Sequence, residues 1–273
     1  IILLYRFEVI MKNGILAASF GTTYKEAREL SLGAIEKEFS GRFPGFAVYK
    51  AYTSSIVKKR IQEKEGIFIP DVLQTFQKMY EDNIENVYIQ PTHIIPGEEY
   101  NKIFDMANQY KDVFNIIKVS APLLNSYNDF EAVADILGCY YKFGSTGGER
   151  AVVLMGHGSG HDANKCYSQF QDVLIQKGFL DVFVSTVEGT PVFDDLLEEL
   201  YKHTYKEITL IPFMVTAGDH AHNDMAGSSK DSWKSRLESL GYNTNIVTRG
   251  IGEIKEIRDI YSAHLEHTIN SSI

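Results

Sequence analysis

Three side chains that can bind a transition metal follow three apolar stretches in the second half of the sequence. His157 follows the run 151–155, Glu188 follows 182–187, and His220 lies in the polar segment after 208–215. Each run has the composition of a buried strand in a parallel sheet, and ligands usually bind at the carboxyl ends of such strands. Two imidazoles and one carboxylate can hold cobalt, nickel, iron or zinc and leave coordination positions open. A neutral histidine can also act as a general base.

Each of the three residues also has a purely structural interpretation. His157 could be a strand-end histidine bonded to a loop, Glu188 could cap a helix or pair with a lysine, and His220 could simply begin a helix. The three residues are far apart in the sequence, so spacing alone does not decide the matter. One metal site would explain all three together.

Composition excludes several other classes of function. The net charge is −9 and the basic residues are scattered, so we expect no binding to nucleic acid or to a membrane surface. There is neither a phosphate-binding loop of the nucleotide-triphosphate type nor a Gly-x-Ser-x-Gly elbow. The two cysteines, Cys139 and Cys166, show no metal-ligand spacing, which fits a reducing cytoplasm. The apolar start lacks the features of a signal peptide, and we expect Met11 to be the native start.

Apolar runs alternate with helical patterns along the whole sequence. The predicted strands cover 14–19, 46–52, 87–90, 115–119, 151–155, 182–187, 207–214 and 243–248. The predicted helices cover 24–39, 54–65, 72–80, 98–110, 129–141, 163–177, 192–203, 229–240 and 253–267. This alternation predicts an α/β protein of two similar doubly wound parallel-sheet domains with an active-site cleft between them. We expect the domains to span 11–143 and 149–273, joined by the glycine-rich stretch 144–148.

The two halves align locally without gaps. Residues 20–22 match 157–159, and 91–98 match 212–219, which places Glu99 opposite His220. Gene duplication followed by divergence would explain this match, with most of the metal ligands retained in the C-terminal domain.

Several multi-residue motifs occur in a characteristic order. They are Ser19-Phe20-Gly21-Thr22, His93-Ile94-Ile95 with Gly97 and Glu99-Tyr100, Gly156-His157-Gly158, Val187-Glu188, Ala217-Gly218-Asp219-His220-Ala221 with Asn223-Asp224-Met225, and Asp231-Ser232-Trp233-Lys234. Through these motifs the sequence resembles, from about Met11 to its end, the anaerobic cobaltochelatases of cobalamin biosynthesis. Those enzymes are class II, ATP-independent chelatases related to ferrochelatase.

The resemblance implies a chelatase-like fold whose two domains enclose a tetrapyrrole. It implies insertion of Co(2+), as substrate metal, into sirohydrochlorin, with no nucleotide or organic cofactor. It makes His157 the proton acceptor and a metal ligand, with Glu188 and His220 completing the metal site.

The acidic side chains of the macrocycle require hydrogen-bond donors. Candidates are hydroxyls and backbone amides near helix N-termini, at Ser19, Thr22, Thr23 and Ser159. Phe20, at the position matching His157, could pack on the face of the ring.

Two further histidines have open roles. His93 could contact the macrocycle or a second metal, or it could pack on its neighbouring prolines. His222 could orient His220 or Asp219, or it could be solvated.

Three alternatives to a cobaltochelatase stay open. Nickel or iron could replace cobalt, because sites of this kind follow the Irving–Williams order. A non-catalytic carrier of metal or tetrapyrrole would have similar lobes, and a metal-dependent hydrolase is a weaker option. The resemblance also leaves a homo-oligomer open.

Overall fold

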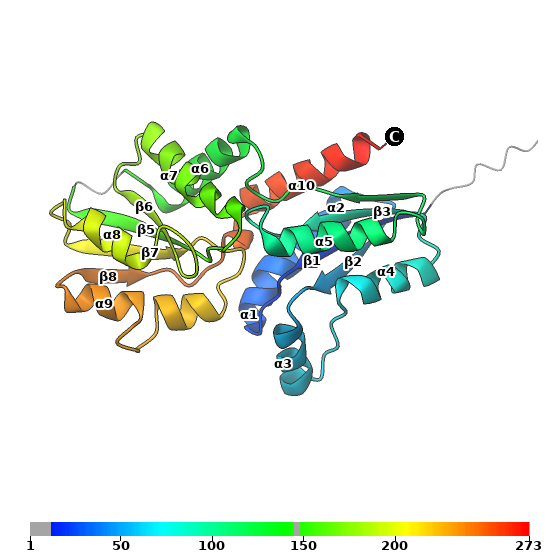
Figure 1. Cartoon of the computed structure of the whole chain (residues 1–273), viewed down its shortest axis with the longest axis horizontal. Coiled ribbons are helices and arrows are strands. Elements are labelled where there is room, and N and C mark those ends of the chain that lie inside the picture. The colour runs from blue at the N-terminus through cyan, green and yellow to red at the C-terminus, as the bar shows by residue number, and fades with distance from the viewer. Residues whose placement is uncertain (1–11, 145–147, 273) are drawn as a thin grey trace, which may run out of the picture.

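The strands form two parallel sheets that lie side by side (Figure 1). The computed structural model describes residues 12–144 and 148–272, so Met11 and the middle of the expected glycine-rich connection lie outside the described residues. Strands β1 (Asn13–Ser19), β2 (Phe46–Tyr52), β3 (Asn86–Pro91) and β4 (Ile116–Val119) form the first sheet. Strands β5 (Arg150–Gly156), β6 (Val182–Thr186), β7 (Glu207–Pro212) and β8 (Asn243–Ile246) form the second.

The two sheets have the same topology. Their strand orders are β2-β1-β3-β4 and β6-β5-β7-β8, and all pairings are parallel. Every residue of β1 after Asn13 and of β5 after Arg150 is buried, because each central strand has helices on both faces. The predicted fold class and the similarity of the two halves are therefore confirmed.

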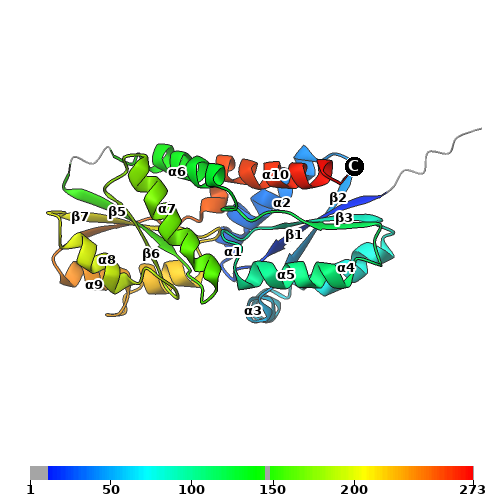
Figure 2. The same cartoon turned by 45° about the horizontal axis from the view of Figure 1, so that its top comes forward.

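Helices cover both faces of each sheet, as Figure 2 shows for α2 and α10 on one face of the first sheet and α4 and α5 on the other. The α-helices are α1 (Lys25–Ala27), α2 (Ala34–Arg42), α3 (Ser55–Glu65), α4 (Val72–Glu81), α5 (Glu98–Gln109), α6 (Tyr127–Tyr141), α7 (Lys165–Gln176), α8 (Phe193–Leu200), α9 (Trp233–Ser239) and α10 (Lys255–Asn270). No helix within 12–144 and 148–272 is both long and apolar enough to cross a membrane.

Two predicted helices differ from the structure. The first, 24–39, is interrupted by a π-helical segment, Arg28–Gly33, between α1 and α2. The helix predicted over 229–240 begins only at Trp233, because the Ser232 hydroxyl caps it by accepting a hydrogen bond from the Ser235 amide. A second π-helical segment, Ala221–Met225, precedes it and was not expected from the sequence.

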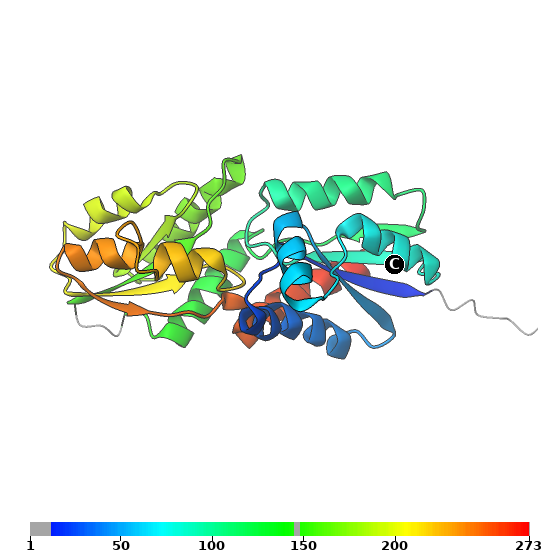
Figure 3. The same ribbon diagram turned by 90° about the horizontal axis from the view of Figure 1, so that it is seen from below.

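The last helix of each half packs on the other half. Helix α6 contacts α7, and the Tyr127 hydroxyl donates a hydrogen bond to Gln176. Helix α10 contacts β3 and α2, so the C-terminus lies beside the first half, behind it in the view from below (Figure 3). The strands thus separate into two sheets, one before and one after residues 144–148, whereas α6 and α10 each pack against the other half. The domain limits 11–143 and 149–273 stay a prediction.

Candidate metal centre and substrate cleft

A cleft of about 600 Å³ opens at the carboxyl ends of both sheets. Its walls come from the segments after β1, β2 and β3 in the first half, and after β5, β6 and β7 in the second. This volume falls within the usual range for small-molecule sites, and the location follows the rule for open parallel sheets. The cleft is therefore a candidate substrate site shared by the two halves.

The loops after β5 and β6 run against each other, backbone to backbone. The Glu188 amide donates a hydrogen bond to the His157 carbonyl at 2.8 Å. Gly158 has φ +87°, and a Cβ there would lie 2.3 Å from the Gly189 nitrogen, so only glycine allows this approach. The Asn164 side chain joins the loops by accepting from the Ser159 amide and donating to the Thr190 carbonyl. These contacts fix His157 and Glu188 as neighbours.

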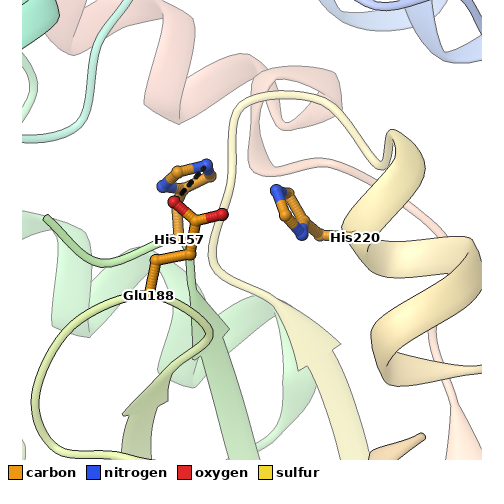
Figure 4. A group of neighbouring side chains, drawn as sticks. All are labelled: His157, Glu188 and His220. Atoms are coloured by element: carbon orange, nitrogen blue, oxygen red, sulfur yellow. Dashed lines mark ion pairs between the residues drawn. The ribbon is translucent and has the colours of Figure 1, made fainter.

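The three predicted metal ligands lie together in this cleft (Figure 4). One ligand atom from each of His157, Glu188 and His220 lies within 4.8 Å of the others. His157 Nε2 is 4.0 Å from Glu188 Oε2, and the two imidazole rings are nearly perpendicular, with centroids 4.8 Å apart. All three side chains are partly exposed, so an ion arriving from solvent can reach them. Their donor set fits a borderline divalent cation that keeps positions free for other ligands.

Hydrogen bonds orient both imidazoles for metal binding. His157 Nδ1 lies 3.0 Å from the Gly158 carbonyl, and His220 Nδ1 lies 2.6 Å from Asp224 Oδ2. A carbonyl or carboxylate partner requires Nδ1 to carry the proton, which leaves the lone pair on Nε2. Each histidine can therefore present Nε2 to a metal, and the Asp224 carboxylate makes His220 a stronger ligand.

Asp224 is the functional candidate that the sequence analysis missed. It lies four residues after His220, on the π-helical segment Ala221–Met225, whose wide turn brings the two side chains together. The spacing of His220 and Asp224 was the available signal. His222, which was weighed for this role, instead stacks on Tyr24 with ring centroids 4.3 Å apart.

Most of the residues expected to contact the substrate line the cleft, namely Phe20, Thr22, Thr23, His93 and Ser159. The Phe20 side chain is 48% exposed, although it is large and apolar, so a flat ligand could cover it.

Ser19 differs from the prediction. It is buried, its hydroxyl accepts a hydrogen bond from Thr92 at 2.9 Å, and it is not among the described residues that line the cleft. Ser19 is the last residue of β1, so its side chain belongs to the sheet interior rather than to the loop.

His93 lines the cleft with both ring nitrogens buried, and neither has a hydrogen-bond partner within the described parts of the chain. Burial lowers the pKa of His93 to about 4, against an opposing effect of Glu99. The imidazole is therefore neutral near pH 7, and its two ring nitrogens keep their hydrogen-bonding capacity unused among the described residues. The Tyr261 hydroxyl of α10 fixes this loop by donating to the carbonyl oxygens of Thr92, at 3.1 Å, and His93, at 3.2 Å.

Glu99 occupies the position that matches His220 in the other half. It is the second residue of α5 and lines the same cleft, where its carboxylate accepts a hydrogen bond from Lys102 at 2.8 Å. Partial burial opposes ionisation of Glu99, but the hydrogen bond from Lys102 helps to outweigh it and lowers the pKa of the carboxyl. The first half thus places an anion where the second half places an imidazole.

Comparison with known proteins agrees with this geometry. Residues 13–270 match the family described as cobalt chelatase (CbiK). A sirohydrochlorin cobaltochelatase from Salmonella typhimurium is 33% identical over 96% of this chain and 98% of its own length. The sirohydrochlorin cobaltochelatase CbiKC from Nitratidesulfovibrio vulgaris is 35% identical over 95% of this chain and 92% of its own.

Two solved structures share the fold at low sequence identity. SirB from Bacillus subtilis, determined with Fe3+, superposes with a TM-score of 0.64 at 14% identity, covering 96% of this chain and 97% of SirB. A multi-domain protein from Deinococcus radiodurans with structural similarity to chelatases gives 0.57 at 12% identity, covering 93% of this chain and 55% of that protein. From the family match along nearly its whole length, the chain belongs to the cobalt chelatase family.

Proposed function

We propose that this chelatase inserts cobalt(II) into sirohydrochlorin, in the cytoplasm and without ATP or an organic cofactor, as a step of anaerobic cobalamin biosynthesis. The observation that carries the proposal is the convergence of His157, Glu188 and His220 in one cleft large enough for an organic ligand. The names of the two relatives with more than 30% identity supply the metal and the ring.

The chemistry requires a metal exchange and the loss of two protons. Cobalt leaves protein ligands and water for the four ring nitrogens, and two pyrrole N–H protons depart, so the charge of the ion is balanced. His157 Nε2 has one lone pair, which cannot hold the metal and accept a proton at once. It therefore takes the first proton after cobalt has moved toward the ring. Glu188 is freed in the same way, and its exposure lets it pass the second proton to water.

The other lining residues position the ring. Phe20 packs on one face, while Thr22, Thr23 and Ser159 offer hydroxyls and amides to the carboxylates of the macrocycle. His93, neutral and without a partner among the described residues, donates to or accepts from the ring at the opposite wall. Nickel and zinc should also enter the same ligand set, because ligands of this type follow the Irving–Williams order.

The test is absorption spectroscopy of sirohydrochlorin with cobalt(II) at catalytic enzyme concentration, with the uncatalysed rate subtracted. Wild-type protein should give many turnovers, and His157→Ala should lose about 100-fold or more of the rate. His222→Ala serves as the matched control, because His222 stacks on Tyr24 and does not belong to the triad. If wild type and His157→Ala both match the uncatalysed rate while the ring still binds, the protein is a carrier and the proposal fails.

A further inference from the structure

Helix α3 breaks the similarity between the two halves. In the second half, residues 187–192 connect β6 directly to α8, whereas in the first half residues 53–71 connect β2 to α4 and contain α3. Figure 1 shows α3 standing off from the rest of the first half. The common fold does not need this helix, so it is a candidate for a function specific to this family's substrate.

Several contacts hold α3 in a fixed position. Ile61 of α3 is fully buried in a separate small core with Leu32, Tyr52 and Ile69. Arg28 donates hydrogen bonds to both carboxylate oxygens of Glu65, at 3.0 and 2.5 Å, which ties the C-terminal end of the helix to the body of the protein. A helix fastened in this way can present its remaining side chains with little loss of conformational entropy on binding.

Helix α3 contributes Val57 and Arg60 to the wall of the cleft. Its neighbouring cations are paired, Lys58 with Asp71 at 3.0 Å and Lys59 with Glu63 at 3.8 Å. Arg60 has no hydrogen bond or ion pair within residues 12–144 and 148–272. A guanidinium left free at the edge of a ligand cleft is available to an anion.

The charges around Arg60 make it distinctive. Four carboxylates line the cleft, at Glu98, Glu99, Glu188 and Asp219, and among the described lining residues only Arg60 is a lysine or arginine. The chain as a whole carries a net charge of −9. The negative electrostatic potential of these carboxylates attracts a divalent cation but repels a ring that bears acetate and propionate side chains.

From these observations we infer that Arg60 binds a peripheral carboxylate of the macrocycle and so sets the ring's position and the enzyme's preference for carboxylate-bearing tetrapyrroles. The inference rests on the proposed function. Arg60 is a binding and specificity residue, since it acts at the rim of the ring and away from the reacting nitrogens. Its planar fork can engage a carboxylate with two parallel hydrogen bonds, which a lysine cannot reproduce.

The test begins with equilibrium binding of sirohydrochlorin without cobalt, followed by the change in ring absorption. Arg60→Ala should raise the dissociation constant about three- to tenfold, and Arg60→Lys should recover part of that loss. Lys59→Ala, which removes an adjacent cation that is already paired, should bind as wild type does. Added salt should reduce the difference between the dissociation constants of wild type and Arg60→Ala, because salt screens a partly exposed ion pair between Arg60 and the ring carboxylate.

Steady-state turnover then separates binding from chemistry. Arg60→Ala should raise KM for the ring by the same factor and leave kcat within about twofold, as expected when ground state and transition state lose the same contact. With a methyl-esterified ring, the difference between Arg60→Ala and wild type should vanish. Arg60→Gln, which keeps a polar side chain on α3, replaces the alanine variant if that one unfolds.

The inference is overturned if Arg60→Ala binds the ring as wild type does, or if its defect persists with the esterified ring. Failure of the proposed function looks different. In that case wild-type protein binds sirohydrochlorin without turnover, and the role of Arg60 is still read from the dissociation constants.

Discussion

The Asp224 carboxylate should strengthen cobalt binding although it does not touch the metal. It lies 2.6 Å from His220 Nδ1 and thereby fixes the imidazole and makes Nε2 a stronger electron donor to a metal. Such partners contribute about 10- to 100-fold to metal affinity, or about 1.4–2.7 kcal/mol. Asp224 is 47% exposed, so solvent screening puts the expected loss for Asp224→Asn at the lower end, about tenfold. Asp224→Ala also removes the hydrogen bond that orients the His220 imidazole, so it should lower the cobalt affinity further.

The measurement is a titration of the apoprotein with cobalt(II), followed by the visible absorption of the bound ion. Asp219→Asn is the matched control, because it removes an equal charge next to His220, while the Asp219 carboxylate accepts its hydrogen bond from Asn223. We expect Asp219→Asn to weaken binding by less than about threefold. Equal losses for the two asparagine variants would mean that only net charge matters, and the argument from imidazole orientation would be refuted.

Three further predictions concern stability and the loops. Because burial lowers the pKa of His93 from 6.5 to about 4, the unfolded chain binds a proton in this range that the folded protein does not, and stability falls as the pH drops through it. Between about pH 7.5 and pH 5, the free energy of unfolding measured in urea should therefore fall by about 2 kcal/mol more for wild type than for His93→Gln. Parallel pH profiles of the two proteins would contradict this. Gly158→Ala should lower the free energy of unfolding by about 1–3 kcal/mol and abolish tight cobalt binding, because the new Cβ would meet the backbone of the loop after β6. Thermal unfolding and cobalt titration measure the two effects. Gly160→Ala is the control, because a Cβ at Gly160 would have no atom within 4 Å. Arg28→Ala should destabilise the protein by about 1–3 kcal/mol and weaken binding of the ring, since it releases α3; an unchanged melting temperature would argue against that attachment.

The convergence of His157, Glu188 and His220 could be predicted from the sequence because it depends on a simple regularity. The carboxyl ends of neighbouring parallel strands meet at one edge of the sheet, so residues in the segments that follow β5, β6 and β7 are expected near one another. The same regularity predicted the position of the cleft, once each half was recognised as a set of βα units.

The deviations have specific physical causes. Ser19 was expected both to end the first strand and to contact the substrate, but as the last residue of β1 it is buried, and its hydroxyl accepts a hydrogen bond from Thr92. Asp224 was missed because it acts from a π-helical turn, which has no clear apolar periodicity. Arg60 carried no motif, and the role inferred for it depends on charges brought together from both halves.

The crossing of α6 and α10 could not be predicted from periodicity. The apolar face of an amphipathic helix shows that the helix packs on something, but it does not identify the sheet. Helix α10 buries Ile257, Tyr261 and Leu265, and nothing in that pattern distinguishes the first half from the second.

The position of α10 has a consequence for the order of events during synthesis. Protein domains generally fold as units, the N-terminal one first, while the chain is still being made. Here β3 and α2 of the first half obtain part of their cover from residues 255–270, which are translated after all the strands of the second sheet. The apolar face of the first half that α10 covers therefore stays exposed until the second half has been synthesised. The two halves become complete together, and the cleft between them forms at the same step.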